Sequence, residues 1–309
     1  MKIFTLNTKS IFHERKLNLT IGNFDGIHRG HQSIIKELIH ISHSDNLHSA
    51  VLSFNPHPRE FFLKSKKPFN IITPSFKKTL FKKLGLDIYI DFEFNIALAS
   101  LSPEEFIKEV LVKKLSIKNI IVSTDFKFGK DRKGDLSFLK EKSKYYKFNV
   151  TVIKPVVEVF SKEKYSSSII REHIKKGMFE KVTEALGRQW HMSGEVILGN
   201  QRGQKNGFPT ANFEPGYHIL PLKGVYCVYA FIDGKQHKGI ANFGERPTVD
   251  GTKLLLETHI FDFKRDIYGK ELTVEFLTFI RAEKKFDNFE KLKEQIKKDI
   301  QTAKTYHKI

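Results

Sequence analysis

The stretch LTIGNFDGIHRGHQSIIKEL, residues 19–38, places two histidines where one apolar pattern gives way to another. Leu17, Leu19 and Ile21 alternate with polar residues, which predicts a β-strand. Apolar residues then recur at helical spacing at positions 34, 35, 38 and 39. The glycine-rich turn between the two patterns therefore lies at the carboxyl end of a strand, where open α/β sheets bind ligands.

The rest of the first half repeats this alternation of strands and helices. Short apolar runs at 50–54, 87–91, 119–123 and 149–153 have the length of buried strands. The segment SPEEFIKEVLVKKL predicts a helix, with Ser102 as N-cap, Pro103 in the first turn and Glu105 closing a capping box. Gly177 ends a further helix, SIIREHIKKG. Helices between buried strands predict a parallel sheet covered on both faces.

The second half has a different pattern. Its strand-like segments are SGEVILG, VYCVYAFIDGKQHKGIANF, LLLETHIFDF and ELTVEFLTFI. Asp233-Gly234 between two apolar runs predicts a hairpin, and a helix is expected only from about Asp287 onward. These features predict a small antiparallel β-barrel with a C-terminal helix. We expect two domains, residues 1–186 and 187–309.

Composition narrows the classes of protein. The chain has 309 residues, a formal charge of +18 and one cysteine, and no apolar run approaches the length of a membrane span. Lysines outnumber arginines by 43 to 10, whereas proteins that read nucleic acid favour arginine for bidentate contacts. We therefore expect a cytoplasmic protein that binds neither nucleic acid nor a membrane. These features give no oligomeric state.

The histidine pair in the turn, His28 and His31, suits phosphate chemistry. Imidazole N–H groups at the start of a helix donate hydrogen bonds to phosphate oxygens, and the helix N-terminus adds positive potential. The pair would then stabilise charge in a transition state without acting as base or nucleophile. Two alternatives remain at this point: a glycine-rich turn with incidental histidines, or two metal ligands, although no further ligand follows at a matching interval.

The string GNFDGIHRGH resembles the nucleotidyltransferase signature of prokaryotic bifunctional riboflavin kinase/FAD synthetases. The resemblance implies a Rossmann-like domain of the HxGH type, in which His28 and His31 hold ATP phosphates while AMP is transferred. It extends to VLSFNPHP, STDFKFGKDRKGD and YSSSIIR. The implied nucleotide and flavin contacts in this half are Gly22, Phe24, Asp25, Gly26, Asn55, His57, Asp125, Phe126, Phe128, Gly129, Ser166, Ser167, Ser168 and Arg171. Ser123-Thr124 stand where the family has glycine followed by an acidic residue.

The string GQKNGFPTANF resembles the riboflavin kinase signature of the same family. Oxygen ligands suit Mg²⁺, which prefers substrate phosphates to a full protein cage. The resemblance implies that Thr210 and Asn212 contact Mg²⁺ with its nucleotide, beside a loop formed by Gly207, Phe208 and Pro209. Gln204 and Asn206 replace a typical arginine and leucine of the family.

Glu257 lies in ETHI on a strand of alternating faces, which it shares with Leu255 and His259. A carboxylate there is either an outward-facing residue beside a lysine or a general base for a hydroxyl group. The resemblance implies the second role, with Arg281 and Phe286 contributing to the flavin side of the site.

Together these motifs predict a bifunctional enzyme that phosphorylates riboflavin to FMN and adenylylates FMN to FAD. Its substrates would be riboflavin, FMN and ATP, with Mg²⁺ as cofactor. The alternatives are another HxGH-type nucleotidyltransferase, or a flavin- or RNA-binding module with a degenerate site.

Overall fold

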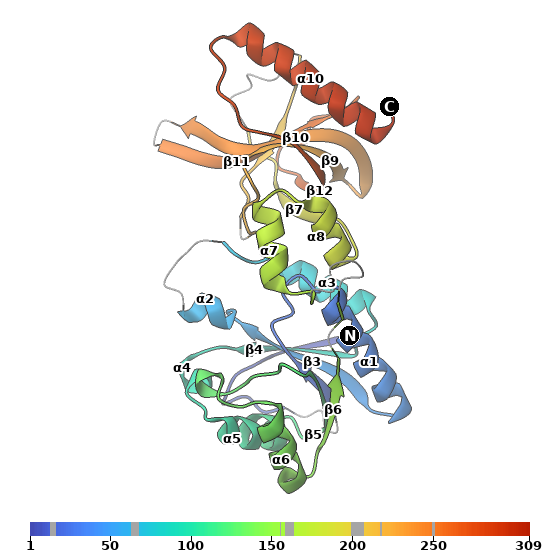
Figure 1. Cartoon of the computed structure of the whole chain (residues 1–309), viewed down its shortest axis with the longest axis vertical. Helices are drawn as coiled ribbons and strands as arrows, with labels where there is room; N and C mark the ends of the chain where they lie inside the picture. Colours follow the sequence, from blue (N-terminus) through green and yellow to red (C-terminus); the bar gives the residue numbers. More distant parts are fainter. Residues whose placement is uncertain are drawn as a thin grey trace. The chain divides into compact units, whose positions relative to one another are not determined.

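The computed structural model describes residues 1–12, 17–62, 68–154, 156–157, 164–198, 207–216, 218–248 and 251–309. The chain divides into two units, each built around its own six-stranded sheet (Figure 1). The first unit comprises Met1–Lys67 and Ile72–Ser166. The second comprises Pro68–Ile71 and Ser167–Ile309.

The sheet of the first unit is parallel throughout, with strand order β1-β4-β3-β2-β5-β6. The strands are β1 Lys2–Leu6, β2 Leu17–Ile21, β3 His48–Asn55, β4 Ile88–Glu93, β5 Ile117–Ser123 and β6 Asn149–Ile153. The predicted parallel sheet is confirmed. Strand β1 was not predicted, because it lies at the sheet edge with only Leu6 buried and lacks the continuous apolar run of an interior strand.

Strand β2 marks the point where the chain changes direction across the sheet. From β2 the chain passes to β3 and β4 on one side, and then returns to β5 and β6 on the other. All five residues of β2 are buried. Because ligands bind at such a switch point, outside the carboxyl ends of the strands, the turn after β2 occupies the expected position for a site.

Helices cover both faces of this sheet. They are α1 Arg29–Ser44, α2 Pro58–Phe62, α3 Pro74–Lys83, α4 Ile96–Ala99, α5 Pro103–Glu105, the π-helix η1 Phe106–Lys114, the 3-10 helix η2 Lys130–Arg132 and α6 Leu136–Tyr146. Side chains of η1 and α6 join the core of β2 through Leu17 and Leu19, and α1 packs over β2 and β3 with Ile35 and Leu38 buried. The capping box of Ser102 and Glu105 is present as predicted.

The second unit contains an antiparallel sheet with strand order β7-β12-β9-β10-β11-β8. Its strands are β7 Trp190–Glu195, β8 Ala211–Phe213, β9 Gly224–Ile232, β10 Lys235–Thr248, β11 Gly251–Ile260 and β12 Glu271–Ala282. Asp233 and Gly234 both have positive φ in the β9–β10 turn, as the hairpin prediction requires. A bridge between Ile197 and Asn212 links the segment after β7 to β8, so the sheet curls back on itself.

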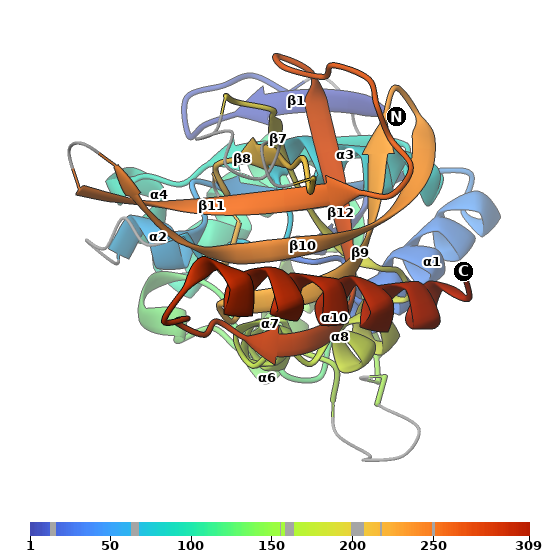
Figure 2. The ribbon, with the colours of Figure 1, turned by 90° about the horizontal axis from the view of Figure 1, so that it is seen from above.

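The described part of the second unit also contains the helices α7 Ser167–Lys175, α8 Phe179–Leu186 and α10 Phe289–His307. Figure 2 shows α10 running alongside β10, which it contacts together with β9. Phe179 of α8 stacks on Trp190 and Phe276 of the sheet, with ring centroids 5.5 and 5.0 Å away. The predicted barrel-type sheet with a C-terminal helix is therefore confirmed. No helix in the described ranges has both the length and the apolar character needed to cross a membrane.

Candidate active sites

The turn after β2 has an unusual backbone. Phe24, Gly26 and Ile27 all have positive φ, at 49°, 86° and 40°, a conformation that is costly for residues with a side chain. The nearly buried Asp25 accepts a hydrogen bond at Oδ1 from the Ile72 backbone N–H, at 3.4 Å. Asp25 thus ties the strained turn to the segment that precedes α3.

The two histidines form one stacked pair. His28 is the N-cap of α1, and its Nδ1 accepts a hydrogen bond from the His31 backbone N–H at 3.3 Å. The imidazole rings are 3.6 Å apart at their centroids and tilted by 20°. A Cβ on Gly30 would lie 3.2 Å from the His28 ring. The glycine between the two histidines therefore leaves room for the ring that caps the helix.

The protonation of the pair follows from its surroundings. Burial, followed by the charges of His28, Lys77 and Lys164, holds the pKa of His31 well below its ordinary value of 6.5. His31 is therefore neutral at neutral pH, and its Nδ1 has no hydrogen-bond partner among the described residues. Because His28 Nδ1 accepts a hydrogen bond, the proton of a neutral His28 is assigned to Nε2. That leaves Nδ1 of His31 as the ring atom available to a ligand.

Two lysines near the pair were missed by sequence analysis. Lys77 of α3 donates to the Asn23 carbonyl oxygen at 2.8 Å; burial lowers the pKa of Lys77, while Asp25 and Asp91 raise it. Lys164 is ion-paired with Asp125, and its charge lowers the pKa of His31. Lys77 is one of four lysines in PSFKKTLFKK, and no spacing distinguishes it from the others.

The second motif follows β3. Asn55 ends the strand and donates through Nδ2 to Asp91 Oδ2 at 3.5 Å. His57 accepts a hydrogen bond at Nδ1 from the Arg59 backbone N–H at 3.0 Å. Both residues therefore lie at the carboxyl end of the strand next to β2, as their position in the sequence predicts.

The third motif follows β5. Burial raises the pKa of Asp125, but hydrogen bonds from Lys164 and from Ser123 Oγ, the latter at 2.5 Å, outweigh it and lower the pKa below its usual value. The rings of Phe126 and Phe128 stack with centroids 5.4 Å apart. Phe128 belongs to the buried core, so Phe126 is the ring with exposed surface.

Several contacts bring the ends of these strands together in the first unit. Gly22 donates its N–H to the Leu52 carbonyl oxygen at 3.1 Å, and Ser53 Oγ donates to the Asn23 carbonyl oxygen at 3.3 Å. Lys164 bonds Asp125 and also lowers the pKa of His31. The three motifs therefore share one edge of the sheet.

The fourth motif falls on the division between the units. Ser166 belongs to the first unit, whereas Ser167, Ser168 and Arg171 belong to the second. Within the second unit, Arg171 donates through Nε to the Phe69 carbonyl oxygen at 2.9 Å. A role of these residues with nucleotide stays a prediction from the resemblance.

The second unit places a carboxylate between two amides. The strand register puts Glu257 of β11 directly opposite Asn212 of β8 on one side and Asn242 of β10 on the other, so the three side chains share one face of the sheet. The buried Oδ1 atoms of Asn212 and Asn242 have no hydrogen-bond partner among the described residues. Unpaired buried amide oxygens are costly unless a ligand or ion uses them.

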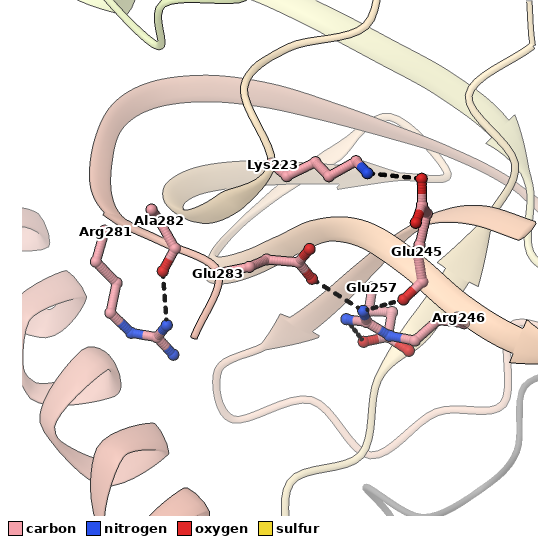
Figure 3. A network of polar contacts seen from close by, with 7 residues as sticks. All are labelled: Lys223, Glu245, Arg246, Glu257, Arg281, Ala282 and Glu283. Atoms are coloured by element: carbon pink, nitrogen blue, oxygen red, sulfur yellow. Dashed lines mark hydrogen bonds and ion pairs between the residues drawn. The ribbon is translucent and has the colours of Figure 1, made fainter. Parts of the chain in front are cut away.

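Glu257 is not an isolated carboxylate. Its Oε2 accepts a hydrogen bond from Arg246 Nη2 at 2.6 Å, and Arg246 also contacts Glu283 (Figure 3). Asn242 and Arg246 were not singled out from the sequence. The period of two in NFGER, which places Asn242, Gly244 and Arg246 on one face, is the signal that could have found them.

The GFPTAN loop leads into β8. Gly207 has a φ of 83°, and the Pro209 carbonyl oxygen lies 2.8 Å from His259 Nδ1. Phe208 packs edge-on against the His259 ring, and Thr210 is half-buried. Gly203, Gln204 and Asn206 lie outside the described residues.

Arg281 has a structural partner. Its guanidinium forms three hydrogen bonds of 2.7 to 3.0 Å with the buried Asp299 of α10, and it lies 5.8 Å from the centroid of Phe286. The pair joins β12 to the C-terminal helix. A flavin contact of Arg281 remains a prediction.

These features define a class: a two-domain transferase with an HxGH-type nucleotidyltransferase unit and a small kinase barrel. Residues 11–169 match the FAD synthetase family, and residues 186–307 match the riboflavin kinase family. The chain belongs to the family of bifunctional riboflavin kinases/FMN adenylyltransferases. The resemblance drawn from the motifs is therefore confirmed.

Relatives with that name match over nearly the whole chain. The protein of Haemophilus influenzae is 38% identical, with 93% of each chain covered. The protein of Buchnera aphidicola subsp. Schizaphis graminum is 37% identical, covering 96% of this chain and 97% of the relative. The Escherichia coli K12 protein is 35% identical, covering 93% and 92%.

A solved structure shares the fold of the whole chain. A crystal structure described as a macrolide-efflux protein from Streptococcus pneumoniae superposes with a TM-score of 0.86 at 31% identity. The match covers 97% of this chain and 99% of that one. Since both family matches and the named relatives agree with the motifs, the alternatives of another transferase or a degenerate binding module are not favoured.

Proposed function

We propose that this chain converts riboflavin to FMN in its barrel and FMN to FAD in its parallel-sheet domain, using ATP in both reactions. The observation that carries the proposal is the row Asn212–Glu257–Asn242, where a carboxylate lies between two buried amide oxygens that have no partner within the described ranges. We assign the kinase activity to residues 187–309 and the adenylyltransferase activity to residues 1–186.

In the kinase reaction, Glu257 is the general base. Its Oε1 has no hydrogen-bond partner among the described residues, whereas Oε2 is held by Arg246. Oε1 accepts the proton of the ribityl 5′-hydroxyl as that oxygen bonds the γ-phosphorus of ATP. The bond from the γ-phosphorus to the bridging oxygen breaks, and ADP leaves. Orientation of the hydroxyl supplies much of the rate enhancement.

The residues around Glu257 fit a magnesium–nucleotide complex. Asn212 offers a buried amide oxygen that no described residue contacts by a hydrogen bond, and Thr210 offers a hydroxyl two residues earlier. Oxygen atoms are the ligands that Mg²⁺ takes, together with water and substrate phosphates. When bound, the ion would neutralise charge on the phosphates. Thr210 and Asn212 would hold it, while Gly207, Phe208 and Pro209 shape the loop.

In the adenylyltransferase reaction, no proton need move. A phosphate oxygen of FMN bonds the α-phosphorus of ATP, the bond to the bridging oxygen breaks, and pyrophosphate leaves. His28 and His31 stabilise the charge on the phosphates by donating hydrogen bonds, with the N-terminus of α1 beneath them. Lys77 and Lys164 add positive charge around His31. The neutral state of His31 suits a hydrogen-bond donor rather than an acid.

The remaining motif residues complete the proposal. Asp125, Phe126, Phe128 and Gly129 follow β5 beside His31 and would receive the flavin, with Phe126 offering the open ring face. Gly22, Phe24, Asp25, Gly26, Asn55 and His57 would line the nucleotide. We place the enzyme in the cytoplasm. We expect it to act on small molecules and not on nucleic acid, because its basic charge comes mainly from lysine.

Substitution of the base tests this assignment. We expect Glu257→Gln to lower the rate of FMN formation from riboflavin by about 100-fold or more, because general-base catalysis contributes about 10² to 10⁴. FAD formation from added FMN should change less than twofold. Separation of flavins by chromatography measures both rates in one preparation. Full FMN formation by the variant would contradict the assignment.

A further inference from the structure

Arg246 connects two carboxylates at the kinase site. From β10 its Nη2 donates to Glu257 Oε2 at 2.6 Å and its Nη1 donates to Glu283 Oε1 at 3.1 Å. Nη1 also donates to the Glu245 carbonyl oxygen at 2.9 Å. Figure 3 shows the guanidinium between Glu257 and Glu283, which follows the end of β12.

The cluster is largely screened from solvent. The side chains of Arg246, Glu257 and Glu283 are 22%, 26% and 33% exposed, so their ion pairs are less weakened by water than surface pairs are. Burial lowers the pKa of Arg246, but the bonds to Glu257 and Glu283 outweigh it and raise the pKa. Arg246 thus stays a cation throughout the physiological range and takes no part in proton transfer.

Gly244 leaves room for the carboxylate of Glu283. A Cβ on Gly244 would overlap the carboxylate of Glu283. Only glycine therefore lets Glu283 reach Arg246 without moving. Gly244, Glu283 and Arg246 form a chain of contacts that ends on Glu257.

The two oxygens of Glu257 are used differently. Oε2 bonds Arg246, whereas Oε1 has no partner among the described residues. A guanidinium held on both sides restricts the rotation of the carboxylate. A base fixed in this way keeps one oxygen aimed at its substrate, and a small misplacement of a reacting group can cost about 100-fold in rate.

We propose that Arg246 is a positioning residue for the kinase reaction: held by Glu283 over Gly244, it fixes Glu257 so that Oε1 faces the riboflavin hydroxyl. The inference rests on the proposed role of Glu257 as base. It assigns to Arg246 an effect on kcat that acts through Glu257.

Steady-state kinetics of the full chain test this role. Arg246→Ala should lower kcat for FMN formation by about 10- to 100-fold with little change in the KM for riboflavin. Arg246→Lys should recover part of kcat, because lysine keeps the charge but not the fork geometry. Added guanidinium ion should raise kcat of Arg246→Ala. An unchanged kcat in Arg246→Ala, or an effect confined to KM, would overturn the proposal.

A neighbouring ion pair provides the matched control. Lys223 and Glu245 are 2.6 Å apart on the same side of the barrel, and Lys223 contacts neither Glu257 nor Arg246 (Figure 3). Lys223→Ala should leave kcat unchanged, since exposed pairs contribute little. An equal loss of kcat in Lys223→Ala would show a general structural effect and overturn the positioning role.

A double variant separates this inference from the proposed function. If Arg246 acts through Glu257, Arg246→Ala should cause no further loss in a Glu257→Gln background. A fully active Glu257→Gln enzyme would refute the proposed function. An inactive Glu257→Gln enzyme beside a fully active Arg246→Ala enzyme would refute only the role of Arg246.

A milder substitution keeps the test open if Arg246→Ala fails to fold. Glu283→Gln leaves the bond between Arg246 and Glu257 in place, and we expect kcat to fall by about twofold to tenfold as the guanidinium becomes less constrained. Gly244→Ala should act in the same direction by displacing Glu283. Unchanged kcat in both variants would overturn the proposal.

Discussion

The amide oxygen of Asn212 is a single buried atom whose surroundings point to a bound ligand. Its side chain is 6% exposed, and its Oδ1 has no partner among the described residues. An unsatisfied buried acceptor costs free energy of folding, about 1–3 kcal/mol. Retaining such an atom beside Glu257 is understandable if substrate-bound Mg²⁺ uses it.

Removal of that oxygen should change the metal requirement. We expect Asn212→Ala to raise the Mg²⁺ concentration for half-maximal FMN formation by about tenfold or more, because one good ligand contributes roughly 1.4 kcal/mol or more. Stability should fall little, since Oδ1 makes no hydrogen bond to the part of the chain that the structure describes. Titration of Mg²⁺ in the FMN assay measures the shift, with FAD formation as the internal control. An unchanged midpoint would argue against Asn212 as a ligand.

The site residues that were identified from the sequence belong to short motifs, and those that were missed do not. His28, His31 and Glu257 were identified because each lies in a short segment with a typical pattern. Lys77 was missed because its burial depends on the packing of α3, which no local spacing records. Arg246 was missed because its partners are distant in the sequence: Glu257 lies on β11 and Glu283 follows β12.

Among the elements, strands were predicted where the sequence has a short apolar run, including the edge strand β6, none of whose residues is fully buried. The β6 prediction agrees with the structure at both ends, and the strand expected over residues 17–22 ends one residue earlier, at Ile21 of β2. Strand β1, KIFTL, was missed because Lys2 and Thr5 interrupt its apolar residues and only Leu6 is buried. Helix α10 begins two residues after the expected position, with Asn288 as its N-cap.

Strand β7 carries a titratable group that should make the second unit sensitive to acid. Burial, followed by the charges of His218 and Arg188, lowers the pKa of His191 from 6.5 to about 4. Below pH 6.5 the unfolded chain therefore binds a proton that the folded unit refuses, so stability falls as pH falls from 6.5 toward 4. By pH 4.5 the loss due to His191 is about 2 kcal/mol.

The single tryptophan reports on this loss directly. Trp190 lies next to His191 and is 1% exposed, so its fluorescence follows unfolding of the second unit. We expect denaturant midpoints to fall between pH 6.5 and 4.5, and to fall less in His191→Gln. Equal pH dependence in the two proteins would mean that His191 is not held neutral.

For the whole molecule, the two structural units differ in their bounds from the two domains proposed from the sequence. The division at 186 and 187 follows the change of pattern in the sequence, whereas the second unit of the structure begins at Ser167 and also takes Pro68–Ile71. Phe179, Val182 and Leu186 of α8 are fully buried, and Trp190 Nε1 donates to the Ile71 carbonyl oxygen at 2.7 Å. The functional barrel therefore packs on a helix that precedes it.

Two fragments test what the barrel needs. Residues 187–309 and 167–309 should both form FMN, but 187–309 should be less stable, on the order of 5 kcal/mol, because it lacks three buried apolar side chains of α8. Thermal unfolding followed by Trp190 fluorescence gives the difference. A folded but inactive 167–309 fragment would contradict assignment of the kinase to this part of the chain.

If the two reactions take place at separate sites, a mixture of two variants, each defective in one reaction, should carry out both. Glu257→Gln should make FMN from riboflavin at least about 100-fold more slowly than the unaltered protein, and the double variant His28→Ala with His31→Ala should stop at FMN. Incubated together with riboflavin, ATP and Mg²⁺, the two proteins should form FAD, since FMN released by one is adenylylated by the other. A mixture that forms no FAD, or either variant losing both activities when assayed alone, would contradict the account.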